Sequence, residues 1–400
     1  MPLSQRAALA AFLLAATAPA ASAAGDTLKI GFITTLTTPS AVIGRDMVDA
    51  VNLALEHHGG TAGGKRIELI VEDDGARPEL GRQKAEKLVR QDGVDIVAGF
   101  VWANVLAASR KPILDAGKIL ISTNAVTNDI AGKTCHPHIF ATRGQADVFA
   151  MALGEAITKA GAKRLYLMAP NYIAGKDFTG GVERTFKGEV AGRDLTKWGD
   201  DPQLDFSAEL AKVKASGADA LFGFYPGRAA VAFARQFDQS GLAGTVKLYT
   251  LFTIDQLALP ALQAANVRSV LGSVTTDFWS PALDNPANKR FVSEFRAKHG
   301  RYPSNYAAAA YDLIPFVKAA VEGGGRPEDA ASMRRALRSA SFSSVRGQFV
   351  LGPNQIPTED YYRVQVTADP QGNWTLTSGE KVLEKVIDPY AAECKMTASN

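Results

Sequence analysis

The chain is poor in the residues that most often carry out chemistry in proteins. Its 400 residues include only two cysteines and five histidines, and none of these is spaced like a set of metal ligands. The loops expected after its strands contain no His, no Cys and no close pair of carboxylates that could act as nucleophile or base. We therefore expect no catalytic centre, no metal site and no cofactor.

The sequence also lacks a membrane span and a basic patch. After the first 23 residues, no stretch reaches the ~20 apolar residues that a spanning helix needs. The formal net charge is only +3, with basic and acidic residues interspersed, so nucleic acid is not an expected partner. Residues 1–23 have the pattern of a secretory signal peptide, with Arg6 before an apolar stretch and small residues before Ala24. No cysteine there could carry a lipid, so we expect a free protein in the periplasm.

Export would place Cys135 and Cys394 in an oxidising compartment. We expect a disulfide between them, which would join the middle of the chain to its end. Two unpaired buried thiols are the alternative.

Most of the chain alternates strands with amphipathic helices. An apolar stretch at 28–34 is followed by a polar loop and by residues 42–57, whose apolar positions recur every four residues. Strand, glycine-containing loop and helix recur at 164–187, within a second series of the same kind. The chain is also longer than one hydrophobic core usually holds. The predicted fold is α/β, with two lobes that each contain a doubly wound parallel sheet.

Other segments give more local predictions. A helix over 104–117 is expected to be interrupted at Pro112, and two further helices are expected at 285–299 and 305–322. The segment 347–376 alternates with period two around turn sequences, which predicts a small antiparallel appendage.

One stretch, HHGGTAGGKR at residues 57–66, is one residue short of a phosphate-binding loop. Gly59, Gly64 and Lys65 have the right spacing, but Arg66 stands where a Ser or Thr must hold magnesium. A phosphate loop also follows a strand and opens a helix, whereas this stretch follows a helix and opens a strand. Ligands of doubly wound sheets lie beyond the carboxyl ends of the strands, at the opposite edge. We interpret the stretch as scaffold.

The loops expected at the carboxyl ends of the strands are rich in hydroxyl, amide and aromatic side chains. They are TTLTTPSAVIG (34–44), FVWANV (100–105), STNAVTND (122–129), APNYIAGKD (169–177), FYPGR (224–228) and LFTID (251–255). Side chains of this kind suit the binding of a small molecule. The sequence therefore predicts a binding protein and not an enzyme.

Several stretches resemble one family over nearly the whole chain after residue 23. They are LKIGFITTLTTPSAVIGRDMVDAVNLALE, GGTAGGKRIELIVEDDGARPELGRQKAEKLV, VDIVAGFVWANVLAA, ILISTNAVTN, APNYIAGKDF, LFGFYPGRAAVAFARQF and SVRGQFVLGPN. They resemble the bacterial periplasmic ligand-binding proteins of the branched-chain amino-acid transport type, which serve ABC importers. The resemblance implies two lobes, joined by three crossover strands, that close on a solute by a hinge motion.

The resemblance also implies how the chain is divided and with what it works. We expect a signal peptide at 1–23, a first lobe from 24–142 plus about 276–325, a second lobe from 143–275 plus about 326–390, and a tail at 391–400. The protein would be a monomer whose closed form is recognised by an ABC transporter permease in the inner membrane.

Solute contacts are implied on loops of both lobes. In the first lobe they fall on Trp102, Ala103 and Asn104, and on the run that contains Ser122, Asn124 and Ala125. In the second lobe they fall on Tyr172, Tyr225, Phe252 and Thr253, with Phe278 near a crossover as a further candidate.

Departures from the family pattern bear on the ligand. Ala103 stands where amino-acid binders commonly have Ser or Thr, and Phe252 and Thr253 stand where they have a carboxylate for the α-ammonium. An ammonium buried without a counter-charge is costly. The aromatic side chains, with Arg143 as a bidentate carboxylate partner, favour an aromatic carboxylate, as in relatives that take up benzoate or coumarate derivatives.

The residues also allow other interpretations. Trp102, Tyr225 and Phe278 could serve only in packing, and Arg143 could pair with Asp147 one helical turn on. A branched-chain amino acid or an amide such as urea is an alternative solute, which an acidic residue reaching the cleft from outside these loops would indicate. An enzyme and a sensory ectodomain are weaker alternatives, because no GxGxxG follows a strand and no membrane span follows the last one.

Overall fold

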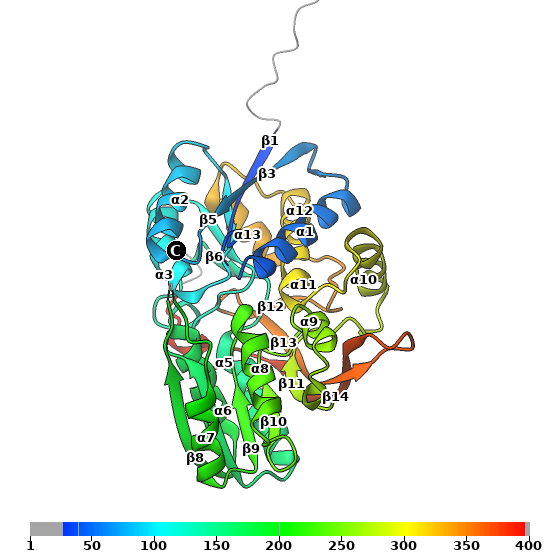
Figure 1. Cartoon of the computed structure of the whole chain (residues 1–400). Helices are drawn as coiled ribbons and strands as arrows, with labels where there is room; N and C mark the ends of the chain where they lie inside the picture. Colours follow the sequence, from blue (N-terminus) through cyan, green and yellow to red (C-terminus); the bar gives the residue numbers. More distant parts are fainter. Residues whose placement is uncertain (1–26, 39, 200, 397–400) are drawn as a thin grey trace, which may run out of the picture.

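The computed structural model describes residues 27–38, 40–199 and 201–396, which form two α/β lobes (Figure 1). Each lobe is built around one largely parallel sheet, as the alternation of strands and helices predicted. The expected signal peptide at 1–23 lies outside the described residues.

The first lobe contains a six-stranded sheet in the order β2-β3-β1-β4-β5-β6, parallel except for the β2–β3 pair. Its strands are β1 (Thr27–Thr34), β2 (Thr61–Ala62), β3 (Lys65–Asp73), β4 (Ile96–Gly99), β5 (Ile119–Ser122) and β6 (Ile139–Ala141). Strands β4, β5 and β6 are buried at every position. They read as continuous apolar runs because both faces of the sheet are covered.

Helices pack on both sides of this sheet (Figure 1). They are α1 (Ala41–His57), α2 (Pro78–Arg90), α3 (Ala103–Asp115), α4 (Asn128–Ala131), α10 (Pro286–His299), α11 (Asn305–Tyr311), α12 (Leu313–Glu322) and α13 (Ala330–Ser339). Helix α2 packs against α3, and α1 packs against α11 and α12. Late segments of the chain therefore complete the first lobe.

The second lobe contains an eight-stranded sheet in the order β12-β13-β11-β10-β9-β7-β8, with β14 beside β13. Its strands are β7 (Arg164–Pro170), β8 (Glu189–Thr196), β9 (Ala220–Gly223), β10 (Lys247–Thr250), β11 (Val274–Asp277), β12 (Val350–Leu351), β13 (Pro357–Ala368) and β14 (Trp374–Val386). The strands from β8 to β11 pair in parallel, and β12, β13 and β14 form an antiparallel edge.

The helices of this lobe are α5 (Ala146–Lys159), α6 (Ile173–Thr185), α7 (Ser207–Ser216), α8 (Arg228–Gln239) and α9 (Leu259–Ala264), with 3-10 turns at Arg268–Val270 and Ala391–Glu393. The first two, α5 and α6, pack closely against each other. Of the helices in the described residues of either lobe, none is long and apolar enough to cross a membrane.

The two lobes share one detail at the start of their first strand-to-helix unit. A Cβ on Gly44 would lie 2.0 Å from the carbonyl oxygen of Thr35, and a Cβ on Gly175 would lie 1.9 Å from that of Pro170. Only glycine lets the first turn of α1 or α6 approach the end of the preceding strand so closely. These contacts set the position of the loop that precedes each helix.

The chain crosses between the lobes three times, at 142–145, 278–285 and 340–349. Arg346, in the third crossing, binds the hinge together. Its Nε lies 3.2 Å from an Asp312 carboxylate oxygen, and its other nitrogens donate to Glu359 and to the carbonyl of Thr142 in the first crossing. This buried network fixes the hinge elements relative to one another.

Several local predictions are wrong. Helix α3 continues through Pro112, because Ile113 remains buried in the core and holds the last turn in place. Strand β8 was not predicted, since it is a largely exposed edge strand with charged residues and no apolar run. The segment 347–376 is not an appendage, because β13 pairs with β11 and extends the second sheet. Helix α13 packs against α12 and β5 of the first lobe, so the expected boundary near residue 325 falls too early.

A disulfide joins Cys135 to Cys394, which confirms the expected pairing. Cys135 belongs to the first lobe. Close to the other cysteine, Tyr390 donates a 2.6 Å hydrogen bond to Asp147 on α5 of the second lobe. The C-terminal segment is therefore attached covalently to one lobe and by a hydrogen bond to the other.

Candidate functional site

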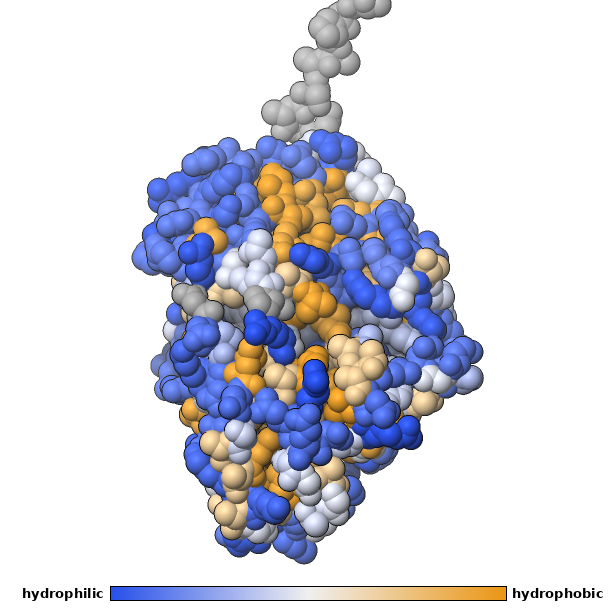
Figure 2. All heavy atoms as spheres, viewed as in Figure 1, coloured by the Kyte–Doolittle hydropathy of each residue, from blue (hydrophilic) through white to orange (hydrophobic). Residues whose placement is uncertain are grey.

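A narrow cavity lies between the two lobes, beyond the carboxyl ends of their strands. Its lining comes from both lobes: Val101, Trp102, Ala103, Asn124, Ala125, Val126, Thr127, Arg143, Ala146, Tyr172, Ala174, Asp177, Phe178, Phe224, Pro226, Phe252 and Tyr306. Figure 2 shows apolar side chains among polar ones around the level where the lobes meet. This is the edge of the sheets at which the sequence predicted the ligand.

A wider hollow of about 1300 Å³ adjoins the cavity and shares Trp102 and Pro226 with it. It is the outer part of the same cleft. We take the smaller cavity as the candidate site because buried polar groups converge on it.

Trp102 forms part of the first-lobe wall and is held by a polar chain. Its indole Nε1 donates to the Thr35 hydroxyl at 2.8 Å, and that hydroxyl donates to Asp74 at 2.6 Å. The centroid of the Trp102 ring lies 5.0 Å from that of Trp198, which belongs to the second lobe. Trp198 in turn stacks on Tyr172, with 4.4 Å between centroids and 13° between planes. The three rings form a contact between the lobes.

Arg143 lies at the first crossing, with only 3% of its surface exposed. One terminal nitrogen donates to the Asn124 side-chain oxygen, and Asn124 itself donates to the Val101 carbonyl at 2.7 Å. Among the described residues, the Arg143 Nε has no hydrogen-bond partner and no carboxylate lies within ion-pair distance of the guanidinium. Arg143 is a buried cation that is only partly satisfied by the protein.

Aromatic rings surround this cation. The guanidinium carbon lies 4.3 Å from the ring centre of Phe149 and 4.7 Å from that of Phe252. Burial lowers the pKa of Arg143, against the opposing influence of Asp277 and other neighbours. The expected pairing with Asp147 is absent, because Asp147 bonds to Tyr390 and to Arg184.

Asp177, on α6, is the acidic group of the cavity. One of its oxygens accepts a 3.2 Å hydrogen bond from Asn128 of the first lobe. The other oxygen is buried and has no hydrogen-bond partner among the described residues. Burial, with a smaller contribution from Asp147, raises the pKa of Asp177 to about 7.

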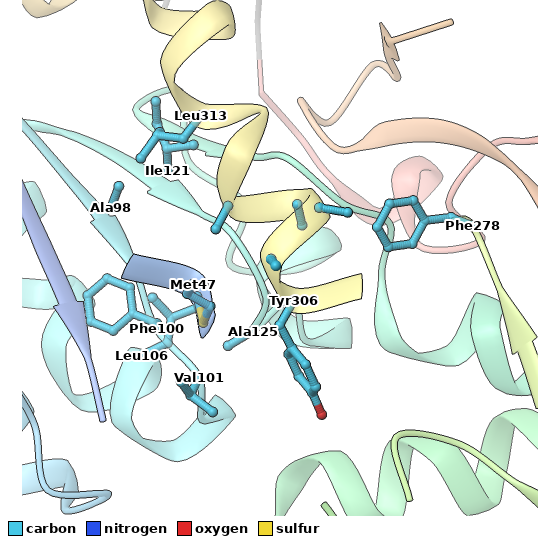
Figure 3. Packing of buried hydrophobic residues seen from close by; sticks show 14 of the residues in the cluster. Met47, Ala98, Phe100, Val101, Leu106, Ile121, Ala125, Phe278, Tyr306 and Leu313 are labelled. Atoms are coloured by element: carbon cyan, nitrogen blue, oxygen red, sulfur yellow. The ribbon is translucent and has the colours of Figure 1, made fainter. Parts of the chain in front are cut away.

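The remaining lining is mostly aromatic. The ring centroid of Phe178 lies 4.5 Å from that of Phe224 and 5.4 Å from that of Phe252. The ring centroids of Phe252 and Tyr306 are 5.6 Å apart. Tyr306 extends from α11 past Ala125, with its hydroxyl directed away from the helix (Figure 3). The backbone at Phe252 is left-handed, with φ of 50°, a conformation that non-glycine residues rarely adopt. Such strain is common where a side chain must be presented to a ligand.

Seven predicted contact residues line the cavity: Trp102, Ala103, Asn124, Ala125, Arg143, Tyr172 and Phe252. Five do not. In the first lobe, Ser122 donates its hydroxyl to the Ala125 carbonyl at 2.8 Å and shapes the loop from within. Asn104 follows Ala103 into α3 and lies outside the lining.

The other three are placed in packing positions. Tyr225 points into the second-lobe core, 4.5 Å from Phe206, as the packing interpretation allowed. The Thr253 hydroxyl accepts from the Tyr225 backbone N–H at 2.7 Å and lies within hydrogen-bond distance of the carbonyls of Leu251, in its own loop, and of Gly223, at the end of β9. Phe278 packs at a crossing against Phe149 and under the guanidinium of Arg346.

Sequence reasoning missed several lining residues. Phe224 and Asp177 stand in loops that were singled out, but the residues chosen there were Tyr225 and Tyr172. Whether a residue lines the cavity depends on the side of the strand end or helix on which its side chain lies. Tyr306 comes from α11, more than a hundred residues after the last strand of the first lobe's sheet. No local pattern in the sequence indicates that this helix returns to the first lobe beside the cavity.

The lining contains no histidine and no cysteine, and its only carboxylate is Asp177. Within the described part of the chain, no group of three His, Cys, Asp or Glu residues could hold a metal ion. The arrangement offers one anchoring cation, one anchoring acid and a set of rings. These features, between two hinged lobes, define a solute-binding protein.

Comparison with known sequences agrees with that class. A model of the periplasmic binding protein family matches residues 27–372, and the chain belongs to this family. Leu/Ile/Val-binding protein homolog 6 of Brucella melitensis is 27% identical over 398 residues, which cover 96% of this chain and 97% of that protein.

Solved structures show the same fold with ligands bound. An ABC-transporter solute-binding protein from R. palustris in complex with benzoate has a TM-score of 0.83 at 25% identity, covering 92% of this chain and all of the other. One from Rhodopseudomonas palustris BisB5, in complex with 3,4-dihydroxybenzoic acid, has a TM-score of 0.84 at 27% identity, covering 91% and 99%. Both are type I, two-lobed binding proteins, as predicted for this chain.

Proposed function

We propose that this solute-binding protein binds a small aromatic carboxylate between its lobes and delivers it to the permease of an ABC importer in the inner membrane. The observation that carries the proposal is Arg143, a buried cation without an ion-pair partner among the described residues. A buried charge is costly unless it is paired. The carboxylate of a bound solute would provide that pair, with two parallel charge-assisted hydrogen bonds.

The rings around Arg143 support an aromatic solute. Phe178, Phe224, Phe252, Tyr172 and Tyr306 line the cavity. Offset or edge-to-face contacts with a ligand ring would each contribute ~0.5–1.5 kcal/mol beyond the burial of area. The benzoate and dihydroxybenzoate complexes of the two similar proteins point to the same class of solute.

Closure of the lobes would complete the site. Trp102 and Asn128 belong to the first lobe and contact Trp198 and Asp177 of the second. A solute that bridges these walls favours the closed form by the contacts that it makes only there. The permease would then recognise the closed monomer, after export of the protein to the periplasm.

A branched-chain amino acid is the second candidate. Asp177 is an acidic residue in the cavity, at the very end of one of the loops singled out in the sequence, and it could pair with an ammonium group. The Brucella relative is named for Leu, Ile and Val. Against this candidate, the side chains between which the solute would lie are mostly aromatic, which suits a flat ring better than an aliphatic side chain.

Thermal unfolding of the mature protein with each of three ligand groups tests the proposal. We expect benzoate and hydroxybenzoates to raise the Tm. At a ligand concentration one hundred times Kd, binding adds ~2.7 kcal/mol to the free energy of unfolding. Leucine, isoleucine and urea should leave it unchanged. Stabilisation by leucine without any effect of aromatic acids would disprove the proposed solute class and favour the second candidate.

A further inference from the structure

The C-terminal segment is fixed to the first lobe in two ways. Cys394 is bonded to Cys135, which lies between α4 and β6. Four residues before this cysteine, the Tyr390 side chain packs against a small apolar cluster that comes mostly from the first lobe: Val126, Ala131, Ala141 and Ile356. A covalent bond and side-chain packing therefore keep Tyr390 on the first lobe.

The hydroxyl of Tyr390 bonds to the second lobe. It donates to the carboxylate of Asp147, on α5, at 2.6 Å and accepts from Arg184, on α6, at 2.8 Å. Arg184 and Asp147 also form an ion pair at 3.0 Å, in which Asp147 is buried. A residue held by the first lobe thus completes a charged network of the second.

Hydrogen bonds continue from Asp147 to the wall of the solute cavity. The Asp147 backbone N–H donates to the side-chain oxygen of Gln145 at 2.9 Å. The Gln145 side-chain amide donates to Asn128 of the first lobe, and Asn128 donates at 3.2 Å to Asp177, which lines the cavity. The Tyr390 hydroxyl is therefore joined to the cavity wall by an unbroken chain of residues.

Val126 provides a second connection, through apolar contacts. It belongs to the cluster on which Tyr390 packs, and it also lines the cavity. Tyr390 itself is not part of the lining. The C-terminal segment therefore supports the cavity wall from behind.

Two of these hydrogen bonds span the lobes, from Tyr390 to Asp147 and from Asn128 to Asp177. Because the disulfide keeps Tyr390 on the first lobe, separation of the lobes would take Asp147 away from its hydroxyl. A contact that exists in only one of two arrangements shifts the equilibrium toward that arrangement. The apparent affinity for a solute rises with the population of the arrangement that binds it.

We propose that Tyr390 is a positioning residue of the solute site, which favours the arrangement in which the lobes meet by holding Asp147 and Arg184 of the second lobe. The disulfide thereby raises solute affinity, although none of the described residues of the C-terminal segment lines the cavity. The inference rests on the proposed function, because it assumes that the solute binds between the lobes.

Tyr390→Phe tests the hydroxyl and keeps the ring in its cluster. We expect benzoate to bind roughly tenfold more weakly in calorimetry, because a hydrogen bond to a charged acceptor is lost. In stopped-flow measurements the dissociation rate should rise and the association rate should change little, as is usual for contacts made in the bound arrangement. A lower unfolding free energy with an affinity within about threefold of wild type would show a merely structural role and overturn the inference.

Tyr362→Phe is the matched control, because Tyr362 lies on β13 and outside the lining. It loses a tyrosine hydroxyl of the same lobe as Asp147 and should keep the wild-type affinity and rates. An equal loss of affinity in both variants would contradict a specific role of Tyr390.

The double change Cys135→Ser with Cys394→Ser tests whether the disulfide acts through Tyr390. Benzoate should again bind more weakly, by roughly 3- to 10-fold. Adding Tyr390→Phe to this variant should then change the affinity by less than about threefold, because both changes weaken the same contact. A further loss of the full tenfold would show that the disulfide and Tyr390 act independently. If the serine variant does not fold, the result for Tyr390→Phe decides the inference.

The two proposals fail in different ways. If benzoate binds and Tyr390→Phe leaves its affinity unchanged, only the role of Tyr390 is wrong. If benzoate does not bind and leucine does, the proposed solute class is wrong, and titration of the same variants with leucine decides the role of Tyr390.

Discussion

Two arginines near the hinge occupy nearly the same kind of environment and differ in one respect. Arg346 and Arg143 are both buried, and each guanidinium lies over an aromatic ring, at 4.3 Å from Phe278 and at 4.3 Å from Phe149 respectively. Arg346 is paired with Asp312 and Glu359. Arg143 is paired with no carboxylate in the described residues.

The difference separates a structural cation from the cation that we propose as the solute anchor. The acids around Arg346 pair with it, so its charge holds the crossings together. The guanidinium of Arg143 has no such acid, and in our proposal the carboxylate of the solute takes that place. Burial without a partner is thus the better indicator of function than burial alone.

The largest effect is expected from Arg346→Met. This change leaves Asp312 and Glu359 buried without their cation, and breaking such a pair costs about 3–5 kcal/mol. Urea unfolding followed by circular dichroism should show that loss of unfolding free energy. An unchanged midpoint would remove the distinction between the two arginines.

The matched change Arg143→Met should affect binding and should cost less stability than Arg346→Met. Loss of two charge-assisted hydrogen bonds should weaken aromatic acid binding by roughly 100-fold or more, measured by calorimetry. The same urea experiment serves as control, because the cation removed has no ion pair to break. Retained affinity in this variant would contradict the assignment of Arg143 as the anchor.

A smaller effect is expected from Tyr172→Leu, which tests whether the wall opposite the anchor binds through its rings. The change removes the stack on Trp198 and one lining ring. We expect a roughly tenfold loss of affinity for any aromatic acid, from ~0.5–1.5 kcal/mol for the lost ring contact together with lost burial. Tyr362→Leu, on β13 and outside the lining, should retain full affinity.

The smallest effect concerns Asp177 and extends the comparison to acids. Burial raises its pKa to about 7, from an ordinary 3.8. The folded protein then holds a proton that the unfolded chain releases, so the contribution of Asp177 to stability falls as pH rises from about 4 to about 7. Asp177→Asn cannot ionise. We expect the Tm of Asp177→Asn to rise relative to wild type by ~1–3 °C between pH 4.5 and pH 8, in thermal scans without ligand.

Asp388→Asn is a suitable comparison for that scan, because burial raises the pKa of Asp388 to about 6, outside the cavity. Its Tm advantage should develop at lower pH and should not respond to ligand. A Tm difference for Asp177→Asn that is constant with pH would show that the carboxylate is already ionised in the folded protein at pH 4.5.

Much of the binding edge could be predicted from sequence. The alternation of strands and helices identified the loops that meet between the lobes, and Trp102, Asn124, Arg143 and Phe252 followed from them. Tyr225 was placed wrongly because it lies one residue beyond Phe224 in the same loop, and adjacent residues of an extended segment point to opposite sides. The loop sequence carries no record of which side faces the cavity.

The sequence by itself determined the two-lobed α/β fold, the edge of the sheets where the candidate cavity lies and the cysteine pair, because these depend on periodicity, order of elements and residue type. Only the tertiary structure decided that Arg346 is paired and Arg143 is not, and that Tyr306 and Asp177 reach the cavity. Pairing of charges depends on segments that are distant in the chain. Asp312 lies 34 residues from Arg346 and Thr142 lies 204 residues away, and no local pattern brings them together.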